Sequence, residues 1–168
     1  MSSASVLNVN LYDEPIGTLT HVSGDRTLFA FTDAYIENDD RPTLGLSFKD
    51  EFGALRTEFR PYHKRVMPFF SNLLPEGRLR KYLAERAGVN HEREFHLLWA
   101  LGHDLPGAMT ITPAEGETWP SDAAQRAETH DDGTRSNALR FSLAGVQLKF
   151  SAVTEASGGL TIPASGVG

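Results

Sequence analysis

Apolar and polar residues alternate with a period of two along the first part of the chain, a pattern typical of β-strands with one buried face. The alternation covers residues 6–12, 16–20 and 28–31. Turn-forming residues separate these segments: Asp13-Glu14-Pro15 follows the first and Ser23-Gly24-Asp25 follows the second. The pattern predicts a small antiparallel meander, and residues 44–48 are a candidate fourth strand.

From about residue 62 the apolar residues recur at spacings of three and four, which indicates helices. The first predicted helix has its apolar face at Val66, Phe69, Phe70, Leu73 and Leu74. Pro75 ends that helix, and a second is predicted over residues 78–87, with Gly88 as its left-handed stop. Asn90 can cap a third helix that has Glu92 and Glu94 in its first turn and ends at Gly102.

These elements, with a returning strand at residues 107–112, predict an α+β fold for residues 1–113, in which helices cover a small antiparallel sheet. Residues 114–136 carry six acidic residues and little that could be buried, so we interpret them as a polar acidic linker or loop. Residues 137–168 begin another unit, where segments 148–153 and 160–162 predict a hairpin.

Composition and charge narrow the possible functions. A net charge of −6 argues against generic binding to nucleic acid. A chain with this net charge can still carry a local basic patch. The absence of cysteine excludes disulfides, cysteine-ligated metal sites and a cysteine nucleophile. We expect a cytoplasmic protein without membrane contact, because no signal peptide and no apolar run of about 20 residues is present.

The candidate site with the clearest chemistry is the segment 141–149, in which small residues lead into a predicted strand. Ala144 and Gly145 would let backbone N–H groups approach phosphates, and Lys149 adds a positive charge. The segment is neither a Walker A motif nor the glycine-rich loop of ordinary protein kinases. Taken alone, the start of an ordinary strand is the favoured interpretation, and a phosphate loop is the alternative.

Other motifs favour structural roles. We interpret the junction of residues 69–77 as core, and we predict no metal site, because His91 and His96 lie about 140° apart on a helix. We place His96 at the edge of the core. A set of basic residues favours a solvated helix face, with an acidic partner or a DNA backbone as the alternative. These residues are Arg60, Lys64, Arg65, Arg78, Arg80, Lys81 and Arg86.

Four strings, in this order, resemble the HipA family of kinase toxins from bacterial toxin–antitoxin modules. They are Leu11-Tyr12 with Gly17-Thr18-Leu19, the string Pro68-Phe69-Phe70-Ser71-Asn72-Leu73-Leu74-Pro75-Glu76-Gly77, the segment from Phe95 to Asp104 with Pro106-Gly107-Ala108, and Ser142-Leu143-Ala144-Gly145-Val146-Gln147-Leu148-Lys149. The resemblance covers nearly the whole chain. It implies that residues 137–168 are the start of a kinase-like small lobe.

The resemblance also implies a site and partners. The nucleotide loop would lie over the phosphates of ATP, and its positions are Ala144, Gly145, Val146, Gln147, Leu148 and Lys149. Ser142 matches the serine that these kinases autophosphorylate, and nearly two added negative charges would expel the loop from the nucleotide pocket. The implied partners are a helix-turn-helix antitoxin of the HipB type, through which DNA is contacted indirectly, and a protein substrate of the aminoacyl-tRNA synthetase type.

The residues for catalysis cannot be placed in this chain, because the family's ATP-pairing lysine and its two aspartates come after the nucleotide loop. ATP and Mg would therefore bind only in a full-length protein that includes the remaining kinase lobe, and we expect this chain alone to be inactive. The alternatives are a stand-alone regulatory or antitoxin-type binding subunit of a split HipA-like system, and a small α+β interaction domain with no link to catalysis.

Overall fold

A computed structural model describes residues 4–118, together with the short strands 153–154 and 160–161. A five-stranded sheet forms the centre of the larger part, in the order β4-β3-β2-β1-β5 with every neighbouring pair antiparallel. The strands are β1 (Ser5–Leu11), β2 (Glu14–Val22), β3 (Arg26–Phe31), β4 (Tyr62–His63) and β5 (Met109–Pro113). The predicted meander and the returning strand are confirmed.

The period of two in the sequence explains which face of the sheet is buried. Along β1 every second residue is fully buried, and the same alternation continues along β3, where Phe29 and Phe31 point to the core. The chain reverses between β1 and β2 at Tyr12 and Asp13, which both have positive φ angles (51° and 67°), as tight hairpins require. The backbone N–H of Tyr12 donates to the carbonyl of Ala108, 2.9 Å away, which ties this turn to the start of β5.

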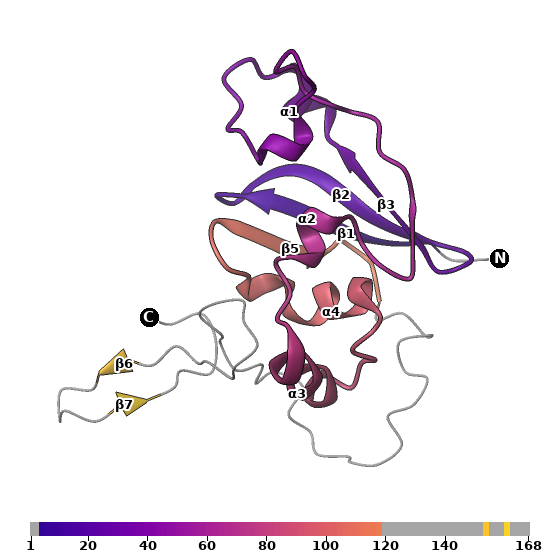
Figure 1. The fold of residues 1–168 in the computed structure, drawn as a ribbon, viewed down its shortest axis with the longest axis vertical. Helices are drawn as coiled ribbons and strands as arrows, with labels where there is room; N and C mark the ends of the chain where they lie inside the picture. Colours follow the sequence, from indigo (N-terminus) through magenta and orange to yellow (C-terminus); the bar gives the residue numbers. More distant parts are fainter. Residues whose placement is uncertain (1–3, 119–152, 155–159, 162–168) are drawn as a thin grey trace.

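Four α-helices and two short 3-10 helices pack around the sheet (Figure 1). They are α1 (Asp33–Glu37), η1 (Leu46–Phe48), α2 (Pro68–Ser71), α3 (Gly77–Ala87), α4 (Glu94–Leu101) and η2 (Gly102–Asp104). In Figure 1, α1 and α3 lie at opposite ends of this part of the molecule, with α2 and α4 between them. The α+β fold class is confirmed.

The core is rich in aromatic side chains. Phe48 and Phe70 are almost completely buried, and they form edge-to-face and tilted ring contacts with Phe29, whose ring centroid lies 5.9 Å and 4.8 Å from theirs. Leu7 and Leu19 on adjacent strands continue this core with no exposed surface. The aromatic rings therefore fix the chain between α1 and α2 against the sheet.

The predicted strand at residues 44–48 is wrong. Residues Leu46–Phe48 form the 3-10 helix η1, and Leu46 is 83% exposed while Phe48 is 1% exposed. In a strand these two residues would share a face. Contacts of Phe48 with Phe29 and Phe31 favour the 3-10 helix, because this conformation buries the Phe48 ring and leaves Leu46 exposed.

Two predicted helices have different limits in the structure. The apolar run 66–74 contains only the four-residue helix α2, because Val66 precedes the helix and residues 72–74 are in turns. Asn90 caps a turn instead of α4: its Oδ1 accepts from the backbone N–H of Glu92 at 2.8 Å, and the helix begins at Glu94. The predicted helix 78–87 and its stop are confirmed, since Gly88 has a φ of 68°.

Gly102 brings the end of α4 close to β5. A Cβ atom at this position would collide with the carbonyl oxygen of Ile111, a residue that is itself buried in the core. Glycine is therefore required where the helix ends against the strand. Beyond this core, β6 (Val153–Thr154) and β7 (Leu160–Thr161) pair antiparallel, which agrees with the predicted hairpin at Val153, Leu160 and Thr161. The described helices are all too short or too polar to cross a bilayer.

Candidate functional site

The predicted nucleotide loop and the predicted phosphorylation site lie outside the described residues. This applies to Ser142 and to Ala144, Gly145, Val146, Gln147, Leu148 and Lys149. Most of the predicted linker, residues 119–136, also lies outside them. Among the described residues, polar side chains gather around Glu94, around Asp25 and beside η1.

A buried carboxylate at the start of α4 is the most connected polar group. Glu94 is 2% exposed, and its carboxylate accepts three hydrogen bonds. The donors are the backbone N–H of Val66 at 3.0 Å, the hydroxyl of Ser71 at 2.8 Å and the guanidinium of Arg80 at 2.9 Å. Each donor comes from a different segment. The Glu94 side chain therefore connects α4 to three others: the loop before α2, α2 and α3.

The electrostatics of this group explain why it persists in the interior. A buried carboxylate is tolerated only when it is paired and hydrogen-bonded. Here the ion pair with Arg80 supplies the opposite charge, and the side chain of Arg80 is itself only 22% exposed. The group holds the string around Phe69 and Phe70 in place. Its carboxylate is buried and paired with the charge of Arg80, which makes it a weak base for the Ser71 hydroxyl that is bonded to it. We therefore assign it a structural role.

The sequence did not reveal this burial. Glu94 was predicted to lie in the first turn of a helix, which is correct, but as a residue favourable to the helix dipole and not as a buried ion-pair partner. The available signal was its position directly before the apolar run from Phe95 to Leu98. Arg80 was grouped with solvated basic residues, and for this residue the prediction is wrong.

A second polar group joins the β2–β3 turn to the residue before α4. The Asp25 carboxylate lies 3.0 Å from Nε2 of His21 and accepts a hydrogen bond from Arg93 at 3.1 Å. Burial on its own would raise the pKa of the Asp25 carboxyl, but the hydrogen bonds from His21 and Arg93 outweigh it, so this pKa lies below its usual value. His21 stacks on Phe95 with a centroid distance of 5.0 Å.

His96 is fully inside the core, and its predicted place at the core edge is wrong. It is 1% exposed, and its ring meets those of His21 and Phe95 edge-on at 5.5 Å and 5.9 Å. The aromatic faces around it explain this burial, because an imidazole ring packs like a small aromatic. Within residues 4–118, no three His, Asp or Glu side chains gather closely enough to hold a metal ion.

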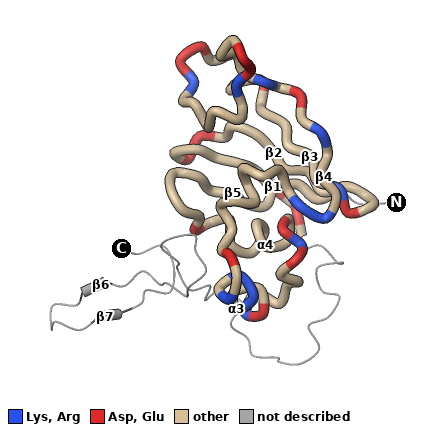
Figure 2. The backbone as a smooth tube through the Cα atoms, viewed as in Figure 1, with Lys and Arg blue, Asp and Glu red and all other residues tan. Residues whose placement is uncertain are grey.

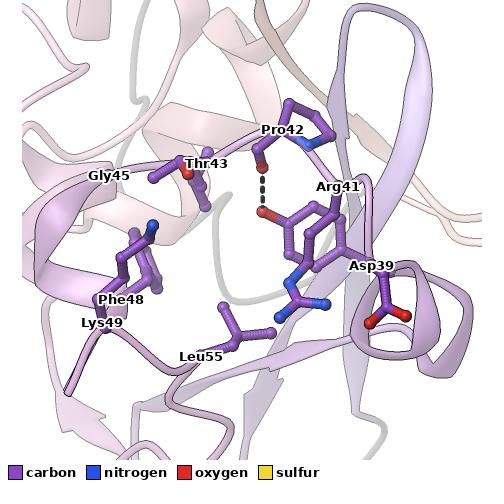
Figure 3. A pocket seen from close by; sticks show the side chains of 11 residues that line it. Asp39, Arg41, Pro42, Thr43, Gly45, Phe48, Lys49 and Leu55 are labelled. Carbon is purple, nitrogen blue, oxygen red and sulfur yellow. Dashed lines mark hydrogen bonds between the residues drawn. The ribbon is translucent and has the colours of Figure 1, made fainter.

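A shallow pocket opens beside η1 (Figure 3). Tyr35 donates a 2.6 Å hydrogen bond to the carbonyl of Pro42 across it. Burial raises the pKa of this phenol, an effect that the backbone of Leu44 and the nearby Arg41 charge only partly offset. Arg41 is itself bound to the carbonyls of Ile36 and Asn38 at 3.0 Å and 2.8 Å. Within the described residues, the Thr43 hydroxyl forms no hydrogen bond with the side chain of Asp39 or Lys49, so the lining shows no paired nucleophile and base.

Comparison with known proteins identifies relatives for the whole chain. The family model described as the HipA N-terminal domain matches residues 7–112. A Sinorhizobium fredii protein named "Putative kinase Y4dM" is 61% identical over 170 residues, which cover 100% of this chain and 41% of that protein. A second protein of the same organism, named "Putative kinase Y4mE", is 32% identical over 96% of this chain and 41% of its own length. The chain thus spans about two fifths of the curated relatives it matches.

Proposed function

The chain belongs to the HipA N-terminal domain family, and from this premise we propose that it is the N-terminal part of a HipA-like kinase that transfers phosphate from ATP to Ser or Thr of a protein. The observation that carries this proposal is the alignment with the first Sinorhizobium relative. It includes all of this chain, and therefore continues past residue 112 through the proposed nucleotide loop at residues 142–149. The name of that relative supports kinase chemistry.

The loop supplies phosphate contacts in this proposal. Ala144 and Gly145 leave the backbone N–H groups accessible to phosphate oxygens, and Lys149 contributes a positive charge nearby. Mg would neutralise the charge that develops on the transferred phosphoryl group. The remaining lobe supplies the lysine and the aspartates that orient ATP and the substrate hydroxyl, so ATP and Mg bind only in the full-length protein and this chain alone does not catalyse.

Ser142 is the regulatory residue of the proposed loop. Its phosphorylation adds nearly two negative charges two residues before Ala144, and these charges repel the phosphates of ATP. A modified loop therefore leaves the nucleotide pocket, and the kinase is switched off. The proposed partners are a helix-turn-helix antitoxin of the HipB type and a translation protein of the aminoacyl-tRNA synthetase type as substrate, in the cytoplasm.

The test joins this chain to the remaining part of the first Sinorhizobium relative, in place of the segment to which it aligns. After incubation with ATP and Mg, mass spectrometry locates the incorporated phosphate. We expect phosphate at Ser142 and its complete loss from that position in Ser142→Ala. Ser151→Ala is the matched control, because Ser151 lies two residues beyond the loop, and it should leave phosphate at Ser142 unchanged.

The same experiment distinguishes the alternatives. Equal phosphate incorporation in Ser142→Ala and in the unmodified protein would contradict the assigned loop. If the chain, added as a separate polypeptide, binds the remaining kinase part and suppresses its activity without being phosphorylated, a regulatory subunit of a split system is the better description. A chimera without any ATP-dependent activity, although folded, would favour an interaction domain.

A further inference from the structure

Exposed positive charges gather at the β4 edge of the sheet. Arg26 in β3 and His63 in β4 are directly opposite each other in the strand register. Lys64 and Arg65 follow at once, and the backbone N–H of Lys64 donates to the carbonyl of Asp25 at 2.7 Å. All four side chains are exposed. We call Arg26, His63, Lys64 and Arg65 the basic edge.

These charges are not neutralised within the described part of the chain. Arg26, Lys64 and Arg65 form no ion pair with any carboxylate there. The neighbouring acidic residue, Asp25, is occupied by His21 and Arg93. The basic edge therefore stands out in a chain of net charge −6, and Figure 2 shows its Lys and Arg residues together beside β4.

Folding alone does not favour this arrangement. Arg26 and His63 lie directly opposite each other on antiparallel strands, and within the described residues neither side chain pairs with a carboxylate. Lys64 also has a φ of 62°, a left-handed conformation that few residues other than glycine, asparagine and aspartate adopt. The left-handed backbone of Lys64 makes the isolated domain slightly less stable, so folding gives no reason to gather these residues here.

We propose that the basic edge binds the phosphodiester backbone of duplex DNA. Interfaces with DNA are strongly positive and polar, whereas lysine is depleted from protein–protein interfaces, whose centres are apolar. The exposed large apolar residue of β3 is Leu28, at only 38% exposure. Binders of single strands use exposed aromatic platforms, and the adjacent Tyr62 is half-buried. Phosphate contacts on a duplex fit the edge best.

This inference goes beyond the proposed function, in which DNA is reached through the antitoxin, and its failure would leave the kinase proposal intact. It predicts weak, sequence-independent and salt-dependent binding. Three full positive charges give a slope of about −2.7 in a plot of log affinity against log salt concentration, because each neutralised phosphate contributes about 0.9. Fluorescence anisotropy of a labelled mixed-sequence duplex, titrated with the 168-residue chain, measures this slope.

The decisive variant is Lys64→Asn with Arg65→Gln, which removes two charges and places at φ 62° a residue that tolerates this conformation. We expect the slope to fall to about −0.9 and the affinity at low salt to fall about tenfold. The matched control, Arg78→Gln with Lys81→Gln, removes two exposed charges from α3 and should leave both values unchanged. Circular dichroism checks that each variant is folded.

Several results would overturn the proposal. One is equal loss of affinity in both double variants, which would show attraction to positive charge anywhere on the molecule. Another is the absence of binding by the unmodified chain at about 50 mM salt, where phosphate contacts are strong. A third is complete displacement of the labelled duplex by poly-glutamate at the same concentration of negative charge, which would assign the edge to an acidic protein. A chain that sediments as a dimer, and becomes monomeric in the Lys64 and Arg65 variant, would assign it to a second copy.

Discussion

The hydroxyl of Ser71 donates a hydrogen bond of 2.8 Å to Oε1 of Glu94, across 23 positions of the sequence. The same oxygen accepts from Arg80, so one carboxylate atom connects α2, α3 and α4. The string from Pro68 to Gly77, which carries much of the resemblance to the HipA family, is thus fixed to the rest of the domain through a polar contact in the core.

Replacing the central carboxylate should destabilise the domain strongly. Glu94→Gln keeps the shape of the side chain but leaves the charge of Arg80 without its partner in the interior. We expect the free energy of unfolding to fall by about 3 kcal/mol, the lower end for a buried pair because Arg80 keeps some exposure. Urea denaturation followed by circular dichroism measures it. Glu92→Gln, at an exposed position just before the same helix, is the control and should change stability by less than about 0.5 kcal/mol.

Removing the hydroxyl should have a smaller effect. In Ser71→Ala the carboxylate of Glu94 keeps its bonds to Val66 and Arg80 and loses one neutral donor. The expected loss is about 1 kcal/mol. Combining this change with Glu94→Gln tests the contact directly, because coupled substitutions are not additive. Strict additivity in the double variant would show that the two side chains do not interact in solution.

The Asp25 cluster should make stability depend on pH. The folded-state pKa of Asp25 lies below its usual value of 3.8, so the carboxylate stabilises the folded chain above that pH. This contribution is lost as the pH falls through the folded pKa. Asp25→Asn should therefore be less stable than the unmodified chain at pH 7, and the difference should shrink as the pH falls below 3.8.

Chemical denaturation at a series of pH values tests the Asp25 prediction. The exposed residue Asp39, replaced by Asn, serves as the control and should cost little at neutral pH. A difference between Asp25→Asn and the unmodified chain that stays constant down to the lowest pH would mean that the carboxylate gains nothing from His21 and Arg93 in the folded state.

The close contact of α4 with β5 predicts a severe effect of one methyl group. Gly102→Ala places a Cβ against the carbonyl of Ile111, and only a shift of the backbone can relieve this clash. We expect a loss of at least about 2 kcal/mol, as in overpacked cores. Gly45→Ala is the control, because its Cβ would make ordinary contacts with Phe69 and Phe48. Equal melting temperatures of both variants would contradict the contact.

The sequence predicted those elements whose pattern is local. Strict alternation predicted β1, β2 and β3, and Gly88 marked the end of α3. Prediction failed where tertiary packing decides. Phe48 turns inward in a 3-10 helix because rings on β3 are there to receive it, and nothing within residues 44–48 encodes that contact.

The candidate site divides in the same way. The loop from Ser142 to Lys149 was predicted by resemblance, and it stays a prediction because it lies outside the described residues. The contacts of Glu94 join residues that are 14, 23 and 28 positions apart, and no periodicity connects them. The basic edge could be predicted only in part. Lys64 and Arg65 stand together in the sequence, but Arg26 reaches them only because β3 pairs with β4.

The position of β1 between β2 and β5 means that β1 cannot complete its strand pairing until late in translation. Its partner β2 follows at once, but the other side of β1 is paired only by β5, and Asn10 meets Thr110 across 100 positions. At about 10 residues per second, translation leaves that strand edge bare for about 10 s. A nascent chain stalled within this interval presents an unpaired strand edge as a template for aggregation, and the pairing of β5 covers that edge.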